Sequence, residues 1–192
     1  MGKLIASEFV SLDGVFEAPG PGEEFKHAGW TFAFDRGEDG NRFKFEELMA
    51  ADAQLLGRVT YEGFAAAWPT MEGTGEFGEK MNSMPKYVVS RKLNNPDWEN
   101  STVLRGALAD EIPAIKADHE GDILVAGSGQ LLRGLLAHEL VDELRLMLFP
   151  IILGSGKRLL ADGTASTRLR LVQSRSIGSD GILILNYVPE YS

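Results

Sequence analysis

Three short segments of the chain combine glycine, hydroxyl and basic residues in patterns that suit phosphate binding. The first reads LLGRVTYE over residues 55–62, where an apolar run ends at Gly57 and helical composition begins near Thr60. Glycine permits a tight turn, and the free N–H groups at a helix start attract a phosphate, to which Arg58 and the Thr60 hydroxyl could add hydrogen bonds. The alternative is a Thr60 N-cap beside a solvated arginine.

The second segment reads VAGSGQLL over residues 125–132. The backbone amides of Gly127, Ser128 and Gly129 could hold a pyrophosphate where a strand meets a helix. The spacing matches the first half of the dinucleotide-binding fingerprint. However, Leu132 stands where the third glycine belongs and the segment lies late in the chain, so a standard Rossmann fold is not expected. An ordinary glycine-rich turn capped by Ser128 is the alternative.

The third segment reads VVSRK over residues 88–92 and ends an apolar run with a hydroxyl and two cations. Ser90 and Arg91 could bind a ribose phosphate, although a pair of solvated surface cations would look the same. In open α/β sheets, ligands lie outside the carboxyl ends of the strands. Because all three segments follow expected strands, together they predict one nucleotide site at one edge of a sheet.

Strand and helix patterns alternate along the chain. The expected strands cover residues 3–10, 53–56, 86–90, 101–104, 122–126, 168–177 and 182–188. The expected helices cover residues 43–51, 60–68, 108–118 and 129–140. Residues 143–153 form an apolar run without helical periodicity, and residues 13–40 form a long loop rich in glycine, proline and aromatic residues.

This alternation predicts an α/β fold, in which right-handed crossovers connect parallel strands. The GSDG segment at residues 178–181 predicts an antiparallel hairpin at the C-terminal end. We therefore expect a single domain over residues 1–192, with three α/β/α layers and a mixed, mostly parallel sheet.

Composition limits the classes of function. The chain has 192 residues, no cysteine, and a net charge of −9 from 19 Lys plus Arg against 28 Asp plus Glu. Without cysteine there are no thiolate nucleophiles or thiolate metal sites, and the three histidines show no metal-binding spacing. The negative charge disfavours nucleic acid. Because no signal peptide or transmembrane stretch is recognisable, we expect a cytoplasmic protein that binds neither membrane nor nucleic acid.

Taken in order, the phosphate-binding segments resemble the dihydrofolate reductase superfamily. Within it, the chain is most similar to the RibD C-terminal domain family, the reductase domain of riboflavin synthesis and its stand-alone relatives. The resemblance is carried by Gly-Arg-x-Thr-Tyr-Glu at 57–62, Val-Ser-Arg at 89–91 and Ala-Gly-Ser-Gly at 126–129, with SLDGV at 11–15 and FPIILGSGK at 149–157 in support. It covers nearly the whole chain and implies a dihydrofolate reductase-like fold and an NADPH-dependent reductase.

The resemblance also implies roles for individual residues. The residues that match the family's cofactor contacts are Gly57, Arg58, Thr60, Ser90, Arg91, Gly127, Ser128, Gly129 and Gln130. Arg58 and Arg91 would favour NADPH over NADH, because guanidinium groups suit a 2′-phosphate. Asp13 and Gly14 match the loop that closes over the nicotinamide.

The sequence departs from the resemblance on the substrate side. Dihydrofolate reductase carries a pterin-binding carboxylate on its first helix, for which Glu46 or Glu47 is the candidate, unless both are solvated. We expect Asp13 to be the catalytic acid or to bind a substrate hydroxyl, with a turn-stabilising role as the alternative. Trp30 could stack on a flat heterocyclic substrate, or belong to a satellite core or a dimer contact. Lys157 could hold a substrate phosphate or be a solvated loop lysine.

The predicted reaction is hydride transfer from NADPH to a C=N or C=O bond of a small heterocyclic or ribosylamino-pyrimidine substrate. The resemblance implies the 5-amino-6-(5-phosphoribosylamino)uracil reductase of riboflavin biosynthesis as the nearest activity. Two alternatives stay open: a dihydrofolate or pterin reductase, and a non-catalytic nucleotide-binding protein on the same fold. The apolar run from Leu144 to Leu153 could bury a homodimer interface, although a central strand would look the same.

Overall fold

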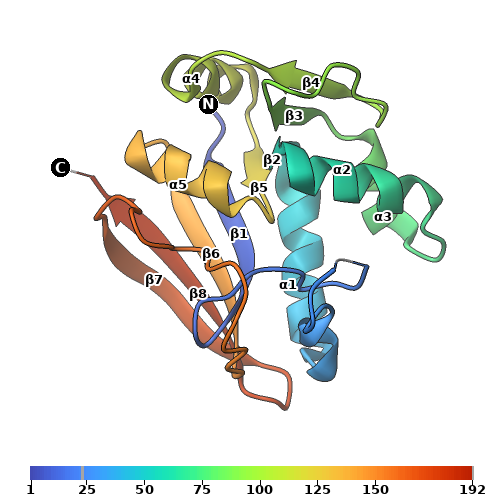
Figure 1. Ribbon diagram of the computed structural model, residues 1–192, viewed down its shortest axis with the longest axis vertical. Helices are drawn as coiled ribbons and strands as arrows, with labels where there is room; N and C mark the ends of the chain where they lie inside the picture. The colour runs from blue at the N-terminus through green and yellow to red at the C-terminus, as the bar shows by residue number, and fades with distance from the viewer. Residues whose placement is uncertain (23, 192) are drawn as a thin grey trace.

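A mixed sheet runs through the part of the chain that the computed structural model describes, residues 1–22 and 24–191 (Figure 1). Its eight strands lie in the order β4-β3-β2-β5-β1-β6-β8-β7. Their bounds are β1 Leu4–Ser11, β2 Ala51–Gly57, β3 Lys86–Val89, β4 Ser101–Leu104, β5 Asp122–Val125, β6 Glu143–Phe149, β7 Arg168–Ile177 and β8 Ile182–Glu190. Pairing is parallel from β4 through β6 and antiparallel between β6, β8 and β7.

Helices cover both faces of the sheet. The first three α-helices are α1 (Gly37–Ala50), α2 (Arg58–Ala67) and α3 (Gly75–Ser83), and their apolar side chains pack on the face of β2, β3 and β5 that carries Leu56, Val88 and Leu124. Helices α4 (Leu108–Asp118) and α5 (Gly129–Ala137) cover the opposite face. Two 3-10 turns, η1 (Trp30–Ala33) and η2 (Trp68–Thr70), complete the elements. This three-layer arrangement confirms the predicted fold class.

The α5 helix shows why the apolar spacing was informative. Leu131, Leu132, Leu135 and Leu136 recur on one side of the helix and are all buried in the core against β1, β2 and β5. Side chains three and four residues apart share a helix face, so this leucine pattern orients α5 on the sheet. The helix N-terminus is thereby held at the carboxyl end of β5, where the second predicted phosphate segment lies.

Two helices differ from the sequence prediction. Helix α1 begins at Gly37 rather than residue 43, and α3 was not predicted. Both contain glycines, which lower helix propensity. Tertiary packing compensates at Gly40, because a Cβ there would come within 2.8 Å of the Ile177 side chain on β7. The absence of a side chain thus lets α1 approach the C-terminal hairpin closely.

Strand β1 continues beyond the end of its neighbour β5, and we call the position beside this unpaired stretch of β1 the crevice. Their ladder joins only Leu4–Ala6 to Ile123–Val125, whereas β1 pairs with β6 from Ile5 to Ser11. The chain leaves β1 through α1 over one face and leaves β5 through α5 over the other, in opposite directions along the sheet. Adjacent strands with opposite crossovers form a topological switch point, the usual ligand position in open α/β sheets.

Candidate active site

Two strand–helix turns contact each other beside this crevice. The backbone N–H of Gly57, after β2, donates to the Ser128 hydroxyl oxygen, after β5, at 2.9 Å. The Thr60 hydroxyl lies 3.1 Å from Ser128 Oγ and donates to the Gly127 carbonyl at 2.8 Å. A Cβ on Gly57 would lie 3.3 Å from Ser128 Oγ, so glycine permits the close approach. The structure therefore brings the first two predicted segments together.

The turns present two helix N-termini. Among the described residues, no side chain caps the first-turn N–H groups of α2 or α5. Such groups carry partial positive charge and bind anions. Arg58, in the first turn of α2, makes a bidentate contact with Glu62 at 2.6 and 2.9 Å, and Gln130 lies exposed in the first turn of α5. The pair of termini is chemically suited to a pyrophosphate.

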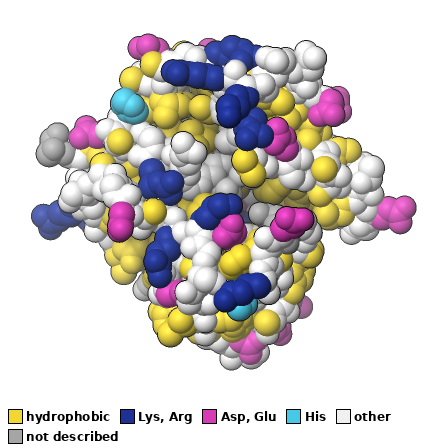
Figure 2. All heavy atoms as spheres, in the orientation of Figure 1, with side chains coloured by type: hydrophobic (Ala, Val, Ile, Leu, Met, Phe, Trp, Pro, Cys, Tyr) yellow, Lys and Arg dark blue, Asp and Glu magenta, His cyan; other side chains and the backbone are white. Residues whose placement is uncertain are grey.

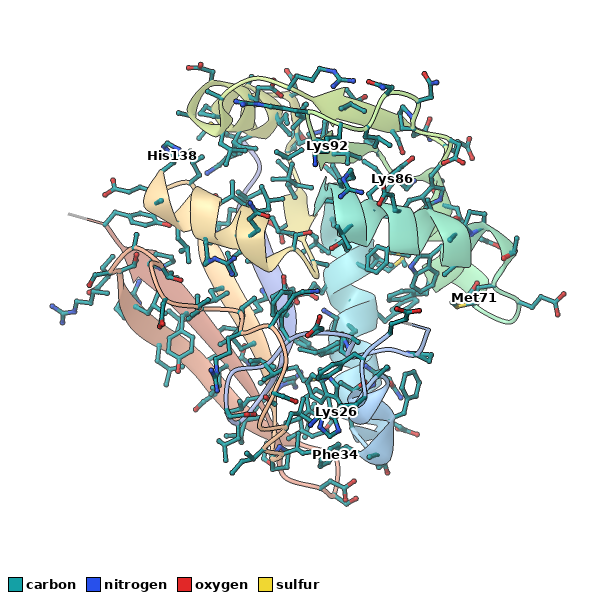
Figure 3. All side chains as sticks on the ribbon, viewed as in Figure 1. Lys26, Phe34, Met71, Lys86, Lys92 and His138 are labelled. Atoms are coloured by element: carbon teal, nitrogen blue, oxygen red, sulfur yellow. The ribbon has the colours of Figure 1, made fainter. Side chains whose placement is uncertain are left out.

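The third predicted segment lines a cavity of about 430 Å³ at the ends of β3 and β4. Its lining includes Ser90, Arg91, Arg105 and His138 beside apolar residues. Figure 2 shows basic side chains gathered on the visible face over β3, β4 and α4, and Figure 3 labels Lys92, just after β3, and His138, just after α5. Two guanidiniums beside an apolar wall suit an adenosine that carries a phosphate on its ribose.

Arg105 is a site residue that the sequence interpretation missed. It directly follows β4, as Ser90 and Arg91 follow β3, and β3 and β4 are parallel neighbours. Side chains after adjacent parallel strands meet at the same sheet edge, so the position of Arg105 was a usable signal. The Ser90 hydroxyl oxygen accepts from the Lys92 amide at 3.1 Å, which leaves its own O–H available to a ligand.

Glu8 was also missed, and it lies at the crevice itself. Its carboxylate oxygen Oε2 accepts from the Gly127 amide at 2.9 Å, across the gap where β1 and β5 have ceased to pair. The other oxygen, Oε1, is buried and has no partner among the described residues. Phe16 packs nearby on Gly129, where a Cβ would come within 2.5 Å of the ring.

Burial determines the charge of Glu8. The residue is 5% exposed, and desolvation raises the pKa of its carboxyl from 4.5 to about 8. The Gly127 amide, the positive charge of Lys44 and the Ser128 amide oppose this rise in pKa, and the negative charge of Glu47 adds to it. A carboxyl in this environment is mostly protonated at neutral pH. Glu8 therefore combines a free oxygen with an exchangeable proton at the switch point.

Asp13 has the environment of the alternative prediction, in which its carboxylate stabilises a turn. Its carboxylate accepts from the Ser11 hydroxyl at 2.6 Å, from the Leu153 amide at 3.1 Å and from the Gly154 amide at 2.9 Å. The Ser11 hydrogen bond is the main reason that the pKa of Asp13 falls to about 2. A carboxylate with that pKa holds no proton at neutral pH, so the geometry does not support Asp13 as the catalytic acid. Instead, it ties the loop after β1 to the segment after β6.

The two predicted substrate contacts are engaged elsewhere. Trp30 is 5% exposed, donates its indole N–H to the Glu17 carbonyl at 2.9 Å and packs edge-on against Phe149. It belongs to a satellite core and has no free ring face for a substrate. The Lys157 ammonium forms an exposed salt bridge with Glu17 at 2.6 Å. Neither residue lines the cavity of the third segment, and their contact with a substrate stays a prediction.

The first helix carries no free carboxylate in the core. Glu46 is exposed, whereas Glu47 is buried and bonded to the Ser7 hydroxyl at 2.8 Å and the Lys44 ammonium at 2.5 Å. The Arg145 guanidinium lies 3.3 Å from the second oxygen of Glu47. Because two cations and a hydroxyl already surround this carboxylate, it is not available to bind a pterin ring without rearrangement.

Metal-binding groups and membrane-spanning helices are both absent from the described residues. Within residues 1–22 and 24–191, no three His, Asp or Glu side chains are grouped so that they could hold a metal ion. In the same part of the chain, no helix has the length and apolar character required to cross a membrane.

The parallel sheet with a C-terminal antiparallel hairpin, and the two turns at its carboxyl edge, define a dihydrofolate reductase-like α/β protein. The model of the RibD C-terminal domain matches residues 2–183. The chain belongs to the RibD C-terminal domain family.

Similar proteins agree with this assignment. Bacillus subtilis (strain 168) YyaP, whose function is uncharacterised, is 28% identical over 141 residues, which cover 72% of this chain and 74% of YyaP. A solved structure provisionally described as a riboflavin biosynthesis protein from Shewanella sp. PV-4 has a TM-score of 0.78 at 19% identity and covers 98% of this chain and 99% of its own. Dihydrofolate reductase from Enterococcus faecalis, complexed with NADP(H) and RAB-propyl, has a TM-score of 0.61 at 17% identity, with coverage of 99% and 98%. These structural likenesses show the fold.

The environment of Glu8 predicts a pH-dependent stability. Between its ordinary pKa of 4.5 and about 8, the folded protein retains a proton that the unfolded chain releases, so stability falls as pH rises through this window. Glu8→Gln removes that titration. Urea unfolding at pH 5 and at pH 8 measures the free energy of unfolding of both proteins. We expect the difference, variant minus parent, to increase by roughly 1–4 kcal/mol from pH 5 to pH 8.

Glu17→Gln is the control. Its salt bridge with Lys157 lowers the pKa of Glu17, so its titration affects stability only under more acidic conditions. If Glu8→Gln differed from the parent protein by the same free energy of unfolding at pH 5 and at pH 8, the burial argument would be contradicted.

Proposed function

We propose that the protein is an NADPH-dependent reductase that reduces a C=N or C=O bond of a small heterocyclic or ribosylamino-pyrimidine substrate. One observation carries the proposal: the cavity of Arg91 and Arg105 follows β3 and β4, and the next two strands along the sheet, β2 and β5, end at uncapped helix N-termini. The order of groups matches a dinucleotide, with a phosphorylated adenosine at β3 and β4 and a pyrophosphate at β2 and β5. The reducing end would then lie at β1.

The residues present fit this cofactor. Arg91, Arg105 and Ser90 would bind the 2′-phosphate and ribose, and the N–H groups at the starts of α2 and α5 would bind the pyrophosphate. Arg58 could join them by leaving Glu62, because this exposed pair has little intrinsic strength. NADPH would supply the hydride, while the protein orients the reactants and excludes water.

Family membership makes the 5-amino-6-(5-phosphoribosylamino)uracil reductase reaction the first to assay. A dihydrofolate or pterin reductase is less well supported, because the buried Glu47 is already paired with Lys44 and Arg145. A non-catalytic nucleotide-binding protein would bind NADPH but would not oxidise it with any reducible substrate.

Arg91→Ala tests the cofactor site. Loss of one guanidinium–phosphate contact is expected to weaken NADPH binding by roughly 10–100-fold, since such charge-assisted bonds contribute about 1.5–3 kcal/mol. NADH affinity should barely change, because NADH lacks the 2′-phosphate. Titration followed by nicotinamide fluorescence measures both constants.

Lys92→Ala is the matched control, because Lys92 is the adjacent exposed cation but does not line the cavity. It should weaken NADPH binding far less than Arg91→Ala. Equal losses in the two variants would indicate only nonspecific attraction, and failure of the parent protein to bind either nucleotide would refute the reductase proposal.

We also infer that the protein forms a homodimer through its C-terminal edge strand. The apolar run that first suggested a dimer is largely explained by β6, which lies inside the sheet between β1 and β8. In contrast, β7 is an edge strand of ten residues, and Leu171 and Val172 on it are 49% and 47% exposed. A long exposed edge with apolar side chains favours pairing with a second copy.

Leu171→Lys should disrupt that dimer by placing a charge in the buried contact. Light scattering after gel filtration should then report a mass near 21.0 kDa instead of twice that value. Leu160→Lys is the control, since Leu160 is similarly exposed at 46% but lies outside β7. A monomeric parent protein would contradict the inference.

A further inference from the structure

In the proposed cofactor arrangement, the carboxyl half of β1 is the next position along the sheet after the two turns. Along the sheet, the adenosine cavity lies at β4 and β3, the two turns at β2 and β5, and the next strand is β1. Glu8 lies on β1 just beyond the last residue that pairs with β5. Its hydrogen bond to Gly127 spans the gap between the strands. The reducing end of a dinucleotide laid along this edge would therefore meet Glu8.

Glu8 differs from the other acids near the crevice in what its oxygens contact. Asp13 accepts three hydrogen bonds, and Glu47 is surrounded by Lys44, Arg145 and a serine hydroxyl. The Oε1 atom of Glu8 has no partner among residues 1–22 and 24–191, although it is buried. Buried polar atoms are normally paired, so an unpaired one at a ligand position indicates a group that a ligand completes.

We propose that Glu8 is the proton donor of this site and that it releases its proton when the adjoining nicotinamide becomes positively charged. This inference rests on the proposed reductase function. Reduction of a C=N or C=O bond requires a hydride at carbon, which NADPH would supply, and a proton at nitrogen or oxygen. Glu8 transfers the proton from its carboxyl group to that atom and is left as a carboxylate. The product is an amine or an alcohol, and solvent restores the proton.

The charges around Glu8 explain why it would keep its proton until the nicotinamide becomes positively charged. Lys44 and Glu47 on α1 act on Glu8 in opposite directions, and the two form a salt bridge with each other. The Gly127 amide stabilises the carboxylate but does not offset the cost of burial. A bound oxidised nicotinamide ring would add one positive charge beside this poorly solvated carboxyl group. Coulombic attraction in such a site favours the ionised form strongly.

Calorimetric proton counting tests the donor without a substrate. NADP⁺ and NADPH are each titrated into the protein at pH 7 in buffers of different ionisation enthalpy. We expect the parent protein to release on the order of half a proton or more with NADP⁺ relative to NADPH, because only NADP⁺ favours the Glu8 carboxylate. Protonation of the 2′-phosphate is common to both ligands and cancels in the difference.

Glu8→Gln should abolish this difference while it retains binding of both nucleotides, since glutamine still accepts from the Gly127 amide. The matched control is Glu46→Gln, which removes an exposed carboxylate of α1 that does not act on Glu8 and should leave the proton difference in place. An undiminished proton difference in Glu8→Gln would overturn the assignment. So would equal proton counts for the two ligands in the parent protein.

A second measurement needs no variant. Below about pH 8, the affinity of the parent protein for NADP⁺ relative to NADPH should rise with pH, by up to about tenfold per pH unit. A constant affinity ratio from pH 6 to pH 8 would overturn the Glu8 inference while the reductase proposal survives. Failure of both nucleotides to bind would instead overturn the reductase proposal, and the inference with it.

Discussion

The hydrogen bond from the Gly57 amide to the Ser128 hydroxyl holds together the parts of the site. It joins a turn after β2 to a turn after β5, and Thr60 reinforces the contact through the Gly127 carbonyl. With the turns fixed in this way, α2 and α5 begin side by side, and the Gly127 amide is aimed at Glu8. A Cβ at position 57 would lie 3.3 Å from Ser128 Oγ, so the Ser128 side chain would have to shift by a few tenths of an ångström. One close backbone approach thus positions the anion-binding termini and the buried acid together.

Sequence reasoning predicted the fold well where periodicity and turns were strong. The leucines of α5, the apolar β5 and the GSDG hairpin all fell within a few residues of their predicted bounds. It placed the start of α1 six residues late and missed α3, because the glycines in both helices lower local propensity. At Gly40, contact with Ile177 replaces what propensity lacks. That contact joins residues far apart in the chain, so no local window of sequence could have indicated it.

The site residues show the same contrast between local sequence signals and long-range contacts. Backbone cradles are recognisable as local patterns, so Gly57, Thr60, Gly127 and Ser128 were named from the sequence and are joined in the structure. Side chains whose role depends on the sheet gave weaker signals in the sequence. Glu8 lies in a mostly apolar strand, and its position beyond the end of β5 is evident only from the strand pairing. Asp13 looked reactive beside Gly14, yet its oxygens are occupied by local donors.

The state of Glu8 also bears on whether this scaffold catalyses or only binds. A protein that merely holds a nucleotide needs anion-binding amides and guanidiniums, and these are already provided by β2 to β5. It gains nothing from a carboxyl that burial keeps protonated and whose second oxygen has no protein partner. Such a group lowers stability at neutral pH, which is a common property of functional sites. Its place on the strand next to the two strand–helix turns therefore favours the proposed chemistry at β1 over binding alone.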